Sequence, residues 1–357
     1  MLFVPKALAI TNEPLTLDPF DLASGGAVLT RATQNDIPAA NPALLPYGAK
    51  KLRWLGLRTA FYAGASSVTL AQELLKDSKT LQKQTNQDFL NLALDHPLHL
   101  GLAEILSFIT SHFGLAFFAN SQPDLKAWRN GDPATGAGTP EIVFHNESYG
   151  GVLASLAGRS PYDWLSFGLT AKYLLISQGV VDLDITDTNA VDEAKTELSE
   201  QDFTSPARGY GIDAGTLLFL QGRVVDFRLG LTADNIGGMR LSKPVTDGPT
   251  LSSYNVGVGF TLHGDADAVH FAVDYRDVTN AYEDPLFKRI YAGTKIVFHR
   301  ILGLATGIYN GAPSYGLELD LFAIKLSFTE YTREYGDSPG VDPREIYIVS
   351  FALGTYF

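Results

Sequence analysis

The sequence of 357 residues contains no cysteine, and it has no run of the roughly 20 consecutive apolar residues that a membrane-spanning helix needs. The absence of cysteine excludes a disulfide framework and any thiolate metal site. Basic residues are also few, since 27 lysines and arginines stand against 39 acidic residues and the formal net charge is −12. Without a basic stripe to neutralise phosphates, nucleic acid is not expected as a partner.

What the sequence does have is alternation, and its last stretch, 345–357, is a clear example. Every second side chain there is apolar, aromatic or β-branched, namely Tyr347, Val349, Phe351, Leu353 and Thr355. The alternate residues from position 350 onward are smaller or more polar, namely Ser350, Ala352, Gly354 and Tyr356. This period of two predicts a β-strand with one apolar face. An apolar final strand is typical of an outer-membrane β-barrel, because it pairs with the first strand and faces lipid. The alternative is an edge strand of a soluble sandwich.

The same rhythm recurs along the chain from residue 51. It predicts about 14 strands, an even number as bacterial barrels require, at 51–64, 97–110, 112–127, 141–158, 163–185, 209–221, 223–239, 252–264, 266–282, 287–299, 301–310, 314–322, 325–336 and 345–357. Short turns alternate with long connections, as periplasmic turns and external loops do in such barrels. Helical spacing between the first two strands predicts a helical insertion, 66–96, in the first external loop. We therefore predict an all-β fold, a transmembrane antiparallel β-barrel over 51–357 with both termini periplasmic.

The alternation also predicts which side chains face the lumen. An arginine or lysine on the lipid side at the bilayer midplane costs about 2–4 kcal/mol, so the polar set must point inward. This lumen-facing polar set is Arg58, Lys172, Asp213, Arg228, Asp234, Asp274, Arg276, Lys295, Glu318 and Asp320. Around a plug these charges would pair with one another and with plug backbone, whereas in an open pore they would be hydrated channel lining. The small residues between them leave room for a plug.

Residues 1–50 lack a membrane-strand pattern and contain a Gly-Gly-Ala segment at 25–27 and the motif Asn-Pro-Ala-Leu-Leu at 41–45. This pattern resembles the N-terminal plug of the long-chain fatty acid transporter (FadL/TodX-like) superfamily, which includes PorV-like and TraF-like outer-membrane barrels. The resemblance implies a 14-stranded barrel with residues 1–50 folded inside as a plug. Many relatives carry Gly-Leu where this chain has Leu44 and Leu45. The plug-motif residues are Gly25, Gly26, Asn41, Pro42 and Ala43; we expect Asn41 and Pro42 to have a structural role as a turn or helix start. Residues 1–9 end in Ala-x-Ala and are interpreted as the remnant of a signal peptide, the alternative being ordinary mature sequence.

Two loops contain candidate sites. In the first loop, apolar side chains at helical spacing form a candidate surface for ligand capture, namely Leu70, Leu74, Leu75, Phe89 and Leu92. The alternative is that these side chains pack across the barrel mouth. In the loop after residue 181, oxygen-bearing side chains at the spacing of a calcium loop suggest Ca²⁺ as a ligand: Asp182, Asp184, Thr186 and Glu193. Asp187 occupies the position where that loop needs Gly, and the alternative is a solvated acidic loop. No other cofactor is expected.

The sequence gives no indication of an enzyme, because no Gly-x-Ser-x-Gly motif is present and the seven histidines are scattered. The resemblance implies passive uptake of a hydrophobic small molecule, fatty-acid-like or aromatic, past the plug of a monomeric barrel in the lipid of a Gram-negative outer membrane. The alternative is a non-transporting barrel that docks another envelope or secretion protein. An apolar lumen would favour the first hypothesis, and a sealed polar lumen the second.

Overall fold

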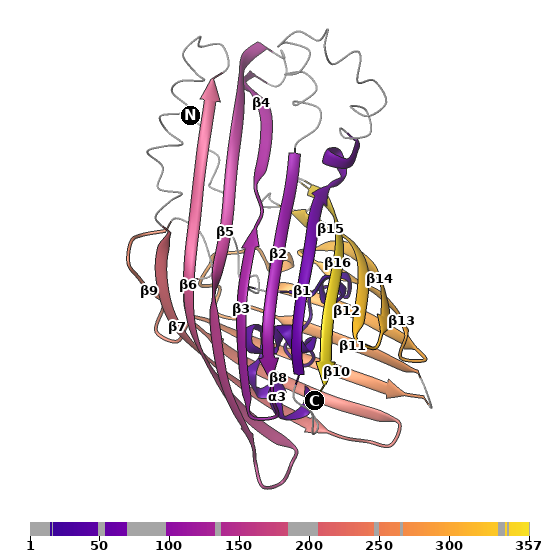
Figure 1. Cartoon of the computed structure of the whole chain (residues 1–357). Helices are drawn as coiled ribbons and strands as arrows, with labels where there is room; N and C mark the ends of the chain where they lie inside the picture. The colour runs from indigo at the N-terminus through magenta and orange to yellow at the C-terminus, as the bar shows by residue number, and fades with distance from the viewer. Residues whose placement is uncertain are drawn as a thin grey trace.

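The computed structural model describes residues 15, 17–48, 54–69, 98–132, 137–184, 206–245, 250–264, 267–334, 340 and 343–356. Within these residues, fourteen antiparallel strands follow one another around a closed barrel, and two shorter strands, β4 and β9, pair beside them (Figure 1). The barrel closes because β1 pairs both with β2 and with the final strand β16. The predicted 14-stranded antiparallel barrel is confirmed.

The wall strands match the predicted strands one for one, with bounds that differ by up to seven residues at their ends. They are β1 (Trp54–Gly64), β2 (Leu98–Ile109), β3 (Phe113–Ser121), β5 (Ala137–Arg159), β6 (Leu165–Asp184), β7 (Ala207–Leu220), β8 (Val225–Asp234), β10 (Ser253–His263), β11 (Ala268–Tyr275), β12 (Ile290–Phe298), β13 (Leu302–Tyr309), β14 (Ala312–Leu321), β15 (Ile324–Glu334) and β16 (Pro343–Tyr356). The short helix α7 (Leu286–Arg289) precedes β12, and β9 (Arg240–Leu241) pairs with β7.

The predicted strand 112–127 is wrong in one respect, because it is broken at Gln122 and Pro123. β3 ends before this break, and β4 (Asp124–Asp132) follows it, pairing with β5 and with the first two residues of β2. Proline has no N–H to donate to the ladder, which accounts for the interruption. β4 and β5 pair as far as residues 132 and 137, so most of the gap predicted between 127 and 141 is strand.

The two rows of side chains on each strand have opposite environments. On β1, Leu57 and Phe61 are 43% and 59% exposed on the outside, whereas Arg58 and Ala60 between them are buried. The outward apolar row recurs around the barrel, for example at Phe167, Leu169, Leu231, Phe271, Leu317 and Phe351. The outer face therefore carries a belt of apolar side chains, as the predicted alternation of faces requires.

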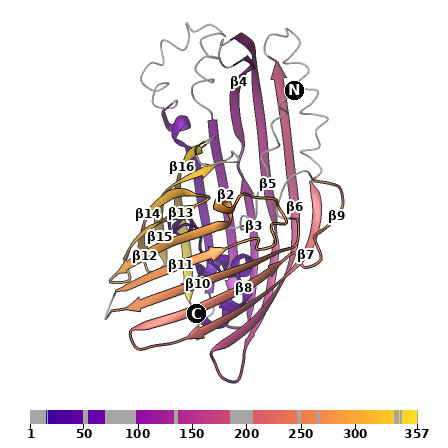
Figure 2. The same ribbon diagram turned by 180° about the vertical axis from the view of Figure 1, so that it is seen from behind.

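Residues 17–48, which we call the inner segment, lie inside the ring of strands (Figures 1 and 2). They form short helices only: α1 (Pro19–Ala23), η1 (Gln34–Asp36), α2 (Ile37–Ala40), η2 (Pro42–Leu44) and α3 (Leu45–Gly48). Side chains cap two of these helices: the Asp18 carboxylate accepts the N–H of Phe20 at 2.8 Å, and the Asn41 side chain accepts the N–H of Ala43 at 3.0 Å.

Among the described residues, none of the helices has the length and apolar character needed to span a membrane.

The inner segment divides the interior into two regions. Near the end of the barrel that has the short turns, Ile37 and Leu45 pack on Ile109 and Phe219. The segment begins towards the opposite end, where the long connections lie. There, Leu17 and Leu22 belong to a second apolar cluster. The strand end at Tyr356 lies beside Trp54, at the short-turn end. The chain therefore runs down the lumen before it enters the wall at β1.

Candidate functional site: the lumen and its inner segment

Buried carboxylates of the inner segment pair with cations of the wall. The Arg58 guanidinium on β1 contacts both carboxylate oxygens of Asp36, at 2.5 and 3.2 Å, and Asp18 at 3.2 Å. On the opposite side of the barrel, Lys295 of β12 pairs with Asp21. Because these charges lie away from solvent, each depends on its partner, and removing one would leave the other uncompensated.

The middle of the segment is held through its backbone. The Asp274 carboxylate on β11 accepts the N–H groups of Val28 and Leu29 at 2.7 and 2.9 Å. Arg276, just past the end of this strand, donates to the carbonyl of Gly26 at 2.6 Å. These bonds join residues almost 250 positions apart and fix the bend that follows α1. Hydrogen bonds to charged groups contribute about 1.5–3 kcal/mol each.

The ten polar residues that we predicted to face the lumen fall into two groups. Arg58, Arg228, Asp274, Arg276 and Lys295 contact the inner segment, Arg228 through the Thr30 carbonyl at 3.2 Å. The other five have partners on neighbouring strands: Lys172 pairs with Asp213 at 2.7 Å, Asp234 accepts from Asn255 at 2.8 Å, and Lys325 lies 3.7 Å from Glu318 and 2.7 Å from Asp320. Half of the set therefore touches the segment and half joins wall strands.

The predicted motif residues lie where segment and wall are closest. Gly25 and Gly26 adopt positive φ angles of 74° and 68°, which side chains rarely adopt, and turn the chain after α1. A β-carbon on Gly25 would lie 2.1 Å from the carbonyl oxygen of Ala292. Asn41 is fully buried, and its amide donates to the carbonyls of Leu29 at 2.8 Å and Thr216 at 3.3 Å. Asn41 thus joins two turns of the segment to β7, and Pro42 and Ala43 open η2 behind it.

The sequence predicts that small inward residues leave room for a plug, but it did not single out the wall glycines that contact the inner segment. A β-carbon on Gly215 would lie 2.1 Å from the Asn41 side-chain oxygen, and one on Gly168 would lie 2.6 Å from the Pro42 backbone. Gly293 and Gly307 approach the backbone of Ser24 and Gly25 in the same way. Their signal in the sequence is a glycine on the inward row of an alternating strand, next to a larger outward residue.

Between the ion pairs, many inward side chains of the wall are apolar and buried, in clusters that also include or contact residues of the inner segment. On the wall from β2 to β7, the buried inward residues form one cluster: Ile105, Ala116, Phe118, Tyr149, Leu153, Leu174, Ile176 and Ala207. On the opposite wall, the rings of Tyr291, Tyr309 and Tyr331 stand edge to face, with centroids 5.4 and 5.5 Å apart, in the cluster that also holds Ile346 and Ile348. A water-filled porin has a polar interior instead. These apolar clusters are tightly packed, since each of their buried residues is at most 8% exposed.

Both predicted loop sites fall largely outside the described residues. The capture side chains Leu70, Leu74, Leu75, Phe89 and Leu92 lie there, as do Thr186 and Glu193 of the calcium hypothesis. Residues 65–69 are helical, and Asp182 and Asp184 lie at the end of strand β6. In the part of the chain that is described, no group of three or more His, Asp or Glu side chains could hold a metal ion.

No family model matches the sequence, and no curated protein matches it. Among solved structures, the Ralstonia pickettii toluene transporter TbuX superposes with a TM-score of 0.52 at 10% identity, over 97% of this chain and 99% of that one. The P. putida toluene transporter TodX gives a TM-score of 0.50 at 11% identity and the same coverage. The TodX deltaS2S3 mutant, a monoaromatic hydrocarbon channel, gives 0.51 at 10% identity, over 95% of this chain and 97% of that one. The chain therefore has the fold of these barrels, which is the fold that the resemblance to the FadL/TodX-like superfamily implies.

Proposed function

We propose that the protein is an outer-membrane channel for the passive uptake of a hydrophobic small molecule, and that the inner segment is its plug. The observation that carries the proposal is the pair of apolar clusters between the wall and the inner segment, in a barrel of this fold. The two toluene transporters that share the fold support the choice of an apolar solute, aromatic or acyl. The apolar belt on the outer face supports a location in lipid.

The arrangement suggests a simple mechanism. A hydrophobic solute enters from the end with the long connections, and it reaches side chains such as Leu153, Leu174 and Tyr309 when the packing around these buried residues opens. Further passage is blocked, because Ile37, Leu44 and their neighbours fill the lumen across to β2 and β7. The segment must therefore shift at least locally, and the positive-φ glycines after α1 are the natural place for a bend. Transport of this kind needs only a concentration gradient.

The alternative of a docking barrel predicts a sealed polar lumen. Polar pairs such as Lys172–Asp213 do occupy the interior, but buried apolar side chains fill much of the rest of it. A mixed interior of this kind differs from the sealed polar lumen expected of a docking barrel. We therefore favour uptake, with residues 1–50 as the plug region and 51–357 as the barrel.

The proposal is tested by uptake of labelled toluene and labelled oleate into cells whose lipopolysaccharide-containing outer membrane slows both. Cells that express the protein should take up at least one of them faster than cells without it, and should gain nothing for glucose. Leu174→Asn places an amide on the apolar lumen wall and should slow uptake, whereas Leu220→Asn at the exposed end of β7 should not. Correct folding of each variant is checked by its heat-dependent mobility on a gel. Uptake that is no faster with the folded protein than without it would contradict the proposal.

A further inference from the structure

A cavity of about 350 Å³, which we call the mouth cavity, opens at the end of the barrel that has the short turns. It lies between α3 of the inner segment, the turn that joins β5 to β6, and the end of β7. Four aromatic rings line it: Tyr47, Tyr162, Trp164 and Phe219. An engineered protein cavity of about 150 Å³ binds benzene, so the mouth cavity has room for a substituted ring.

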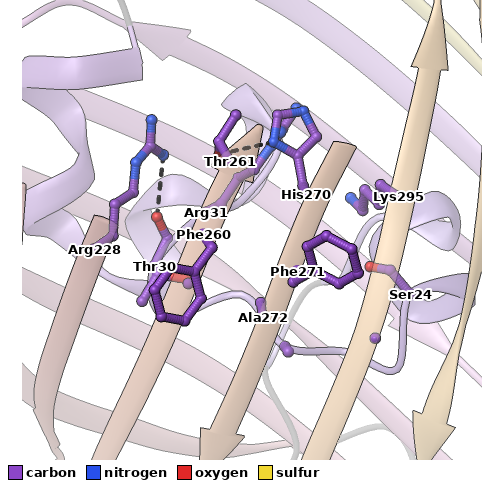
Figure 3. A pocket seen from close by; sticks show the side chains of 13 residues that line it. Ser24, Thr30, Arg31, Arg228, Phe260, Thr261, His270, Phe271, Ala272 and Lys295 are labelled. Atoms are coloured by element: carbon purple, nitrogen blue, oxygen red, sulfur yellow. Dashed lines mark hydrogen bonds between the residues drawn. The ribbon is translucent and has the colours of Figure 1, made fainter. Parts of the chain in front are cut away.

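A second cavity, between the inner segment and strands β8, β10, β11 and β12, differs in size and in lining (Figure 3). Its volume of about 20 Å³ holds one or two particles the size of water. The cationic side chains of Arg31, Arg228 and Lys295 gather along one side of it. A solute of the size of an aromatic ring therefore fits the mouth cavity and not this one.

The mouth cavity faces the lumen and not the lipid. Trp164 stands two residues before the buried Ser166, and Phe219 stands two residues after the buried Leu217, so both rings are on the inward rows of their strands. They continue the register of β6 with β7, because the Phe219 N–H donates to the Trp164 carbonyl at 2.7 Å. Rings of an aromatic girdle would instead be on the outward rows, at the membrane interface.

The mouth cavity adjoins the apolar cluster that blocks passage. Phe219 is 7% exposed and belongs to that cluster together with Ile37 and Leu45. Tyr47 packs against the same cluster, and its ring stands edge to face with that of Phe219, with centroids 4.9 Å apart. A solute that passes the cluster when the inner segment shifts therefore arrives beside these two rings.

The charged group at the rim of the mouth cavity, Arg159, already has partners. It donates to the carbonyl of Pro46, lies 3.8 Å from the Asp163 carboxylate, and stands 4.4 Å from the centre of the Tyr47 ring. The carboxylate of a fatty acid would have to compete with these partners. A neutral aromatic solute needs only contacts between rings, which are favourable at about 4.5–7 Å between centroids.

We propose that the mouth cavity is an exit-side binding site for a neutral monocyclic aromatic molecule. The ring of the solute contacts the buried Phe219 and the pair formed by Tyr162 and Trp164, whose rings stack with centroids 6.4 Å apart. The site holds the solute once the inner segment has closed behind it, and release follows the concentration gradient. The inference rests on the proposed uptake, and of the two solute classes named there it selects the aromatic one.

Quenching of Trp164 fluorescence measures binding at the mouth cavity. The sequence has three tryptophans, so Trp54→Phe together with Trp128→Phe leaves Trp164 as the reporter. In the full chain embedded in lipid nanodiscs, bromobenzene should quench this fluorescence saturably, in addition to a linear part from probe dissolved in the lipid. The ring-free probe 1-bromohexane should give the linear part alone. Quenching by bromobenzene without a saturable part, or an equal saturable part with 1-bromohexane, overturns the proposal.

A matched pair of variants tests the ring contacts. Tyr162→Ser removes one ring of the site from an exposed turn, and it should weaken the saturable binding of bromobenzene about two- to tenfold, as expected for one contact between rings. The control Phe322→Ser removes an exposed ring from the turn between β14 and β15 and should leave the binding unchanged. Equal affinity in the two variants overturns the proposal.

This binding assay needs no transport, so its result is separable from that of the uptake test. Toluene uptake by the wild type without saturable quenching overturns the mouth site and leaves the proposed function standing. Saturable quenching by bromobenzene without uptake supports the mouth site as a place where an aromatic ring binds and contradicts the proposed function.

Discussion

Replacing Asp36 by asparagine should release part of the inner segment from the barrel wall. In the wild type, both carboxylate oxygens of Asp36 face the Arg58 guanidinium, at 2.5 and 3.2 Å, and both side chains are almost fully buried. The substitution keeps the size of the side chain and removes its charge. Arg58 then retains one acidic partner, Asp18, at 3.2 Å.

Removing one partner of a buried ion pair costs about 3–5 kcal/mol. Because Asp18 remains beside Arg58, we expect the lower end of that range, about 3 kcal/mol. The cost falls on docking of the segment, since the barrel ladders are unchanged. A factor of ten corresponds to about 1.4 kcal/mol, so local opening around η1 and α2 should become roughly 100 times more frequent.

Amide hydrogen exchange measures this opening directly. The amides to follow are those of Asn41 and Leu44, which donate to the carbonyls of Ile37 and Asn41 at 3.2 and 3.0 Å. The control is Asp320→Asn, because Asp320 and its partner Lys325 are both more than a quarter exposed. Such pairs contribute at most about 1 kcal/mol, and exchange in the segment should change less than about fivefold. Equal exchange in Asp36→Asn and in the wild type would refute the idea that this pair anchors the segment.

Two further substitutions test the packing of the segment and the orientation of the strands. Gly215→Ala places a methyl group against the Asn41 side chain, and this overpacking, which costs about 1–3 kcal/mol, should speed hydrogen exchange of the Asn41 amide. The control Gly158→Ala has open space around the new methyl group and should leave that exchange unchanged. Similar exchange in both variants would contradict the close approach of Gly215 to Asn41. Leu57→Arg puts a charge on the outer face and should destabilise the barrel in lipid vesicles by up to about 2–4 kcal/mol in urea titrations. Leu57→Met should be nearly neutral, and equal stability of the two variants would contradict a lipid-facing position.

The barrel could be predicted from the sequence because its physical cause is local. A strand between lipid and lumen must alternate, and the pattern from Leu55 to Phe61 or from Tyr347 to Leu353 records that directly. The division of one strand into β3 and β4 was not predicted. Pro123 signals it, but the alternation continues past the proline and masks the break.

The contacts of the inner segment could be predicted only in kind. The sequence shows that inward charges need partners, but nothing local to Arg58 or Arg276 names Asp36 or the Gly26 carbonyl as those partners. The close approaches of the wall glycines depend on distances between residues far apart in the chain, which no local pattern records.

The central claim is that the inner segment must move for a solute to pass. Because the chain has no cysteine, a single engineered pair can lock the segment without competing disulfides. Thr30 is suited to this, since its β-carbon lies 3.1 Å from a β-carbon built on Gly259 of β10. Disulfides span about 3.5–4.5 Å between β-carbons, so the two residues need to separate only slightly.

The most direct measurement is toluene uptake by cells that express the double variant Thr30→Cys and Gly259→Cys, before and after reduction. The account predicts background uptake in the oxidised form, recovery on reduction, and no redox effect in either single-cysteine variant. If the oxidised, fully cross-linked barrel carried toluene as fast as the reduced one, the segment would not be the gate and the account would be contradicted.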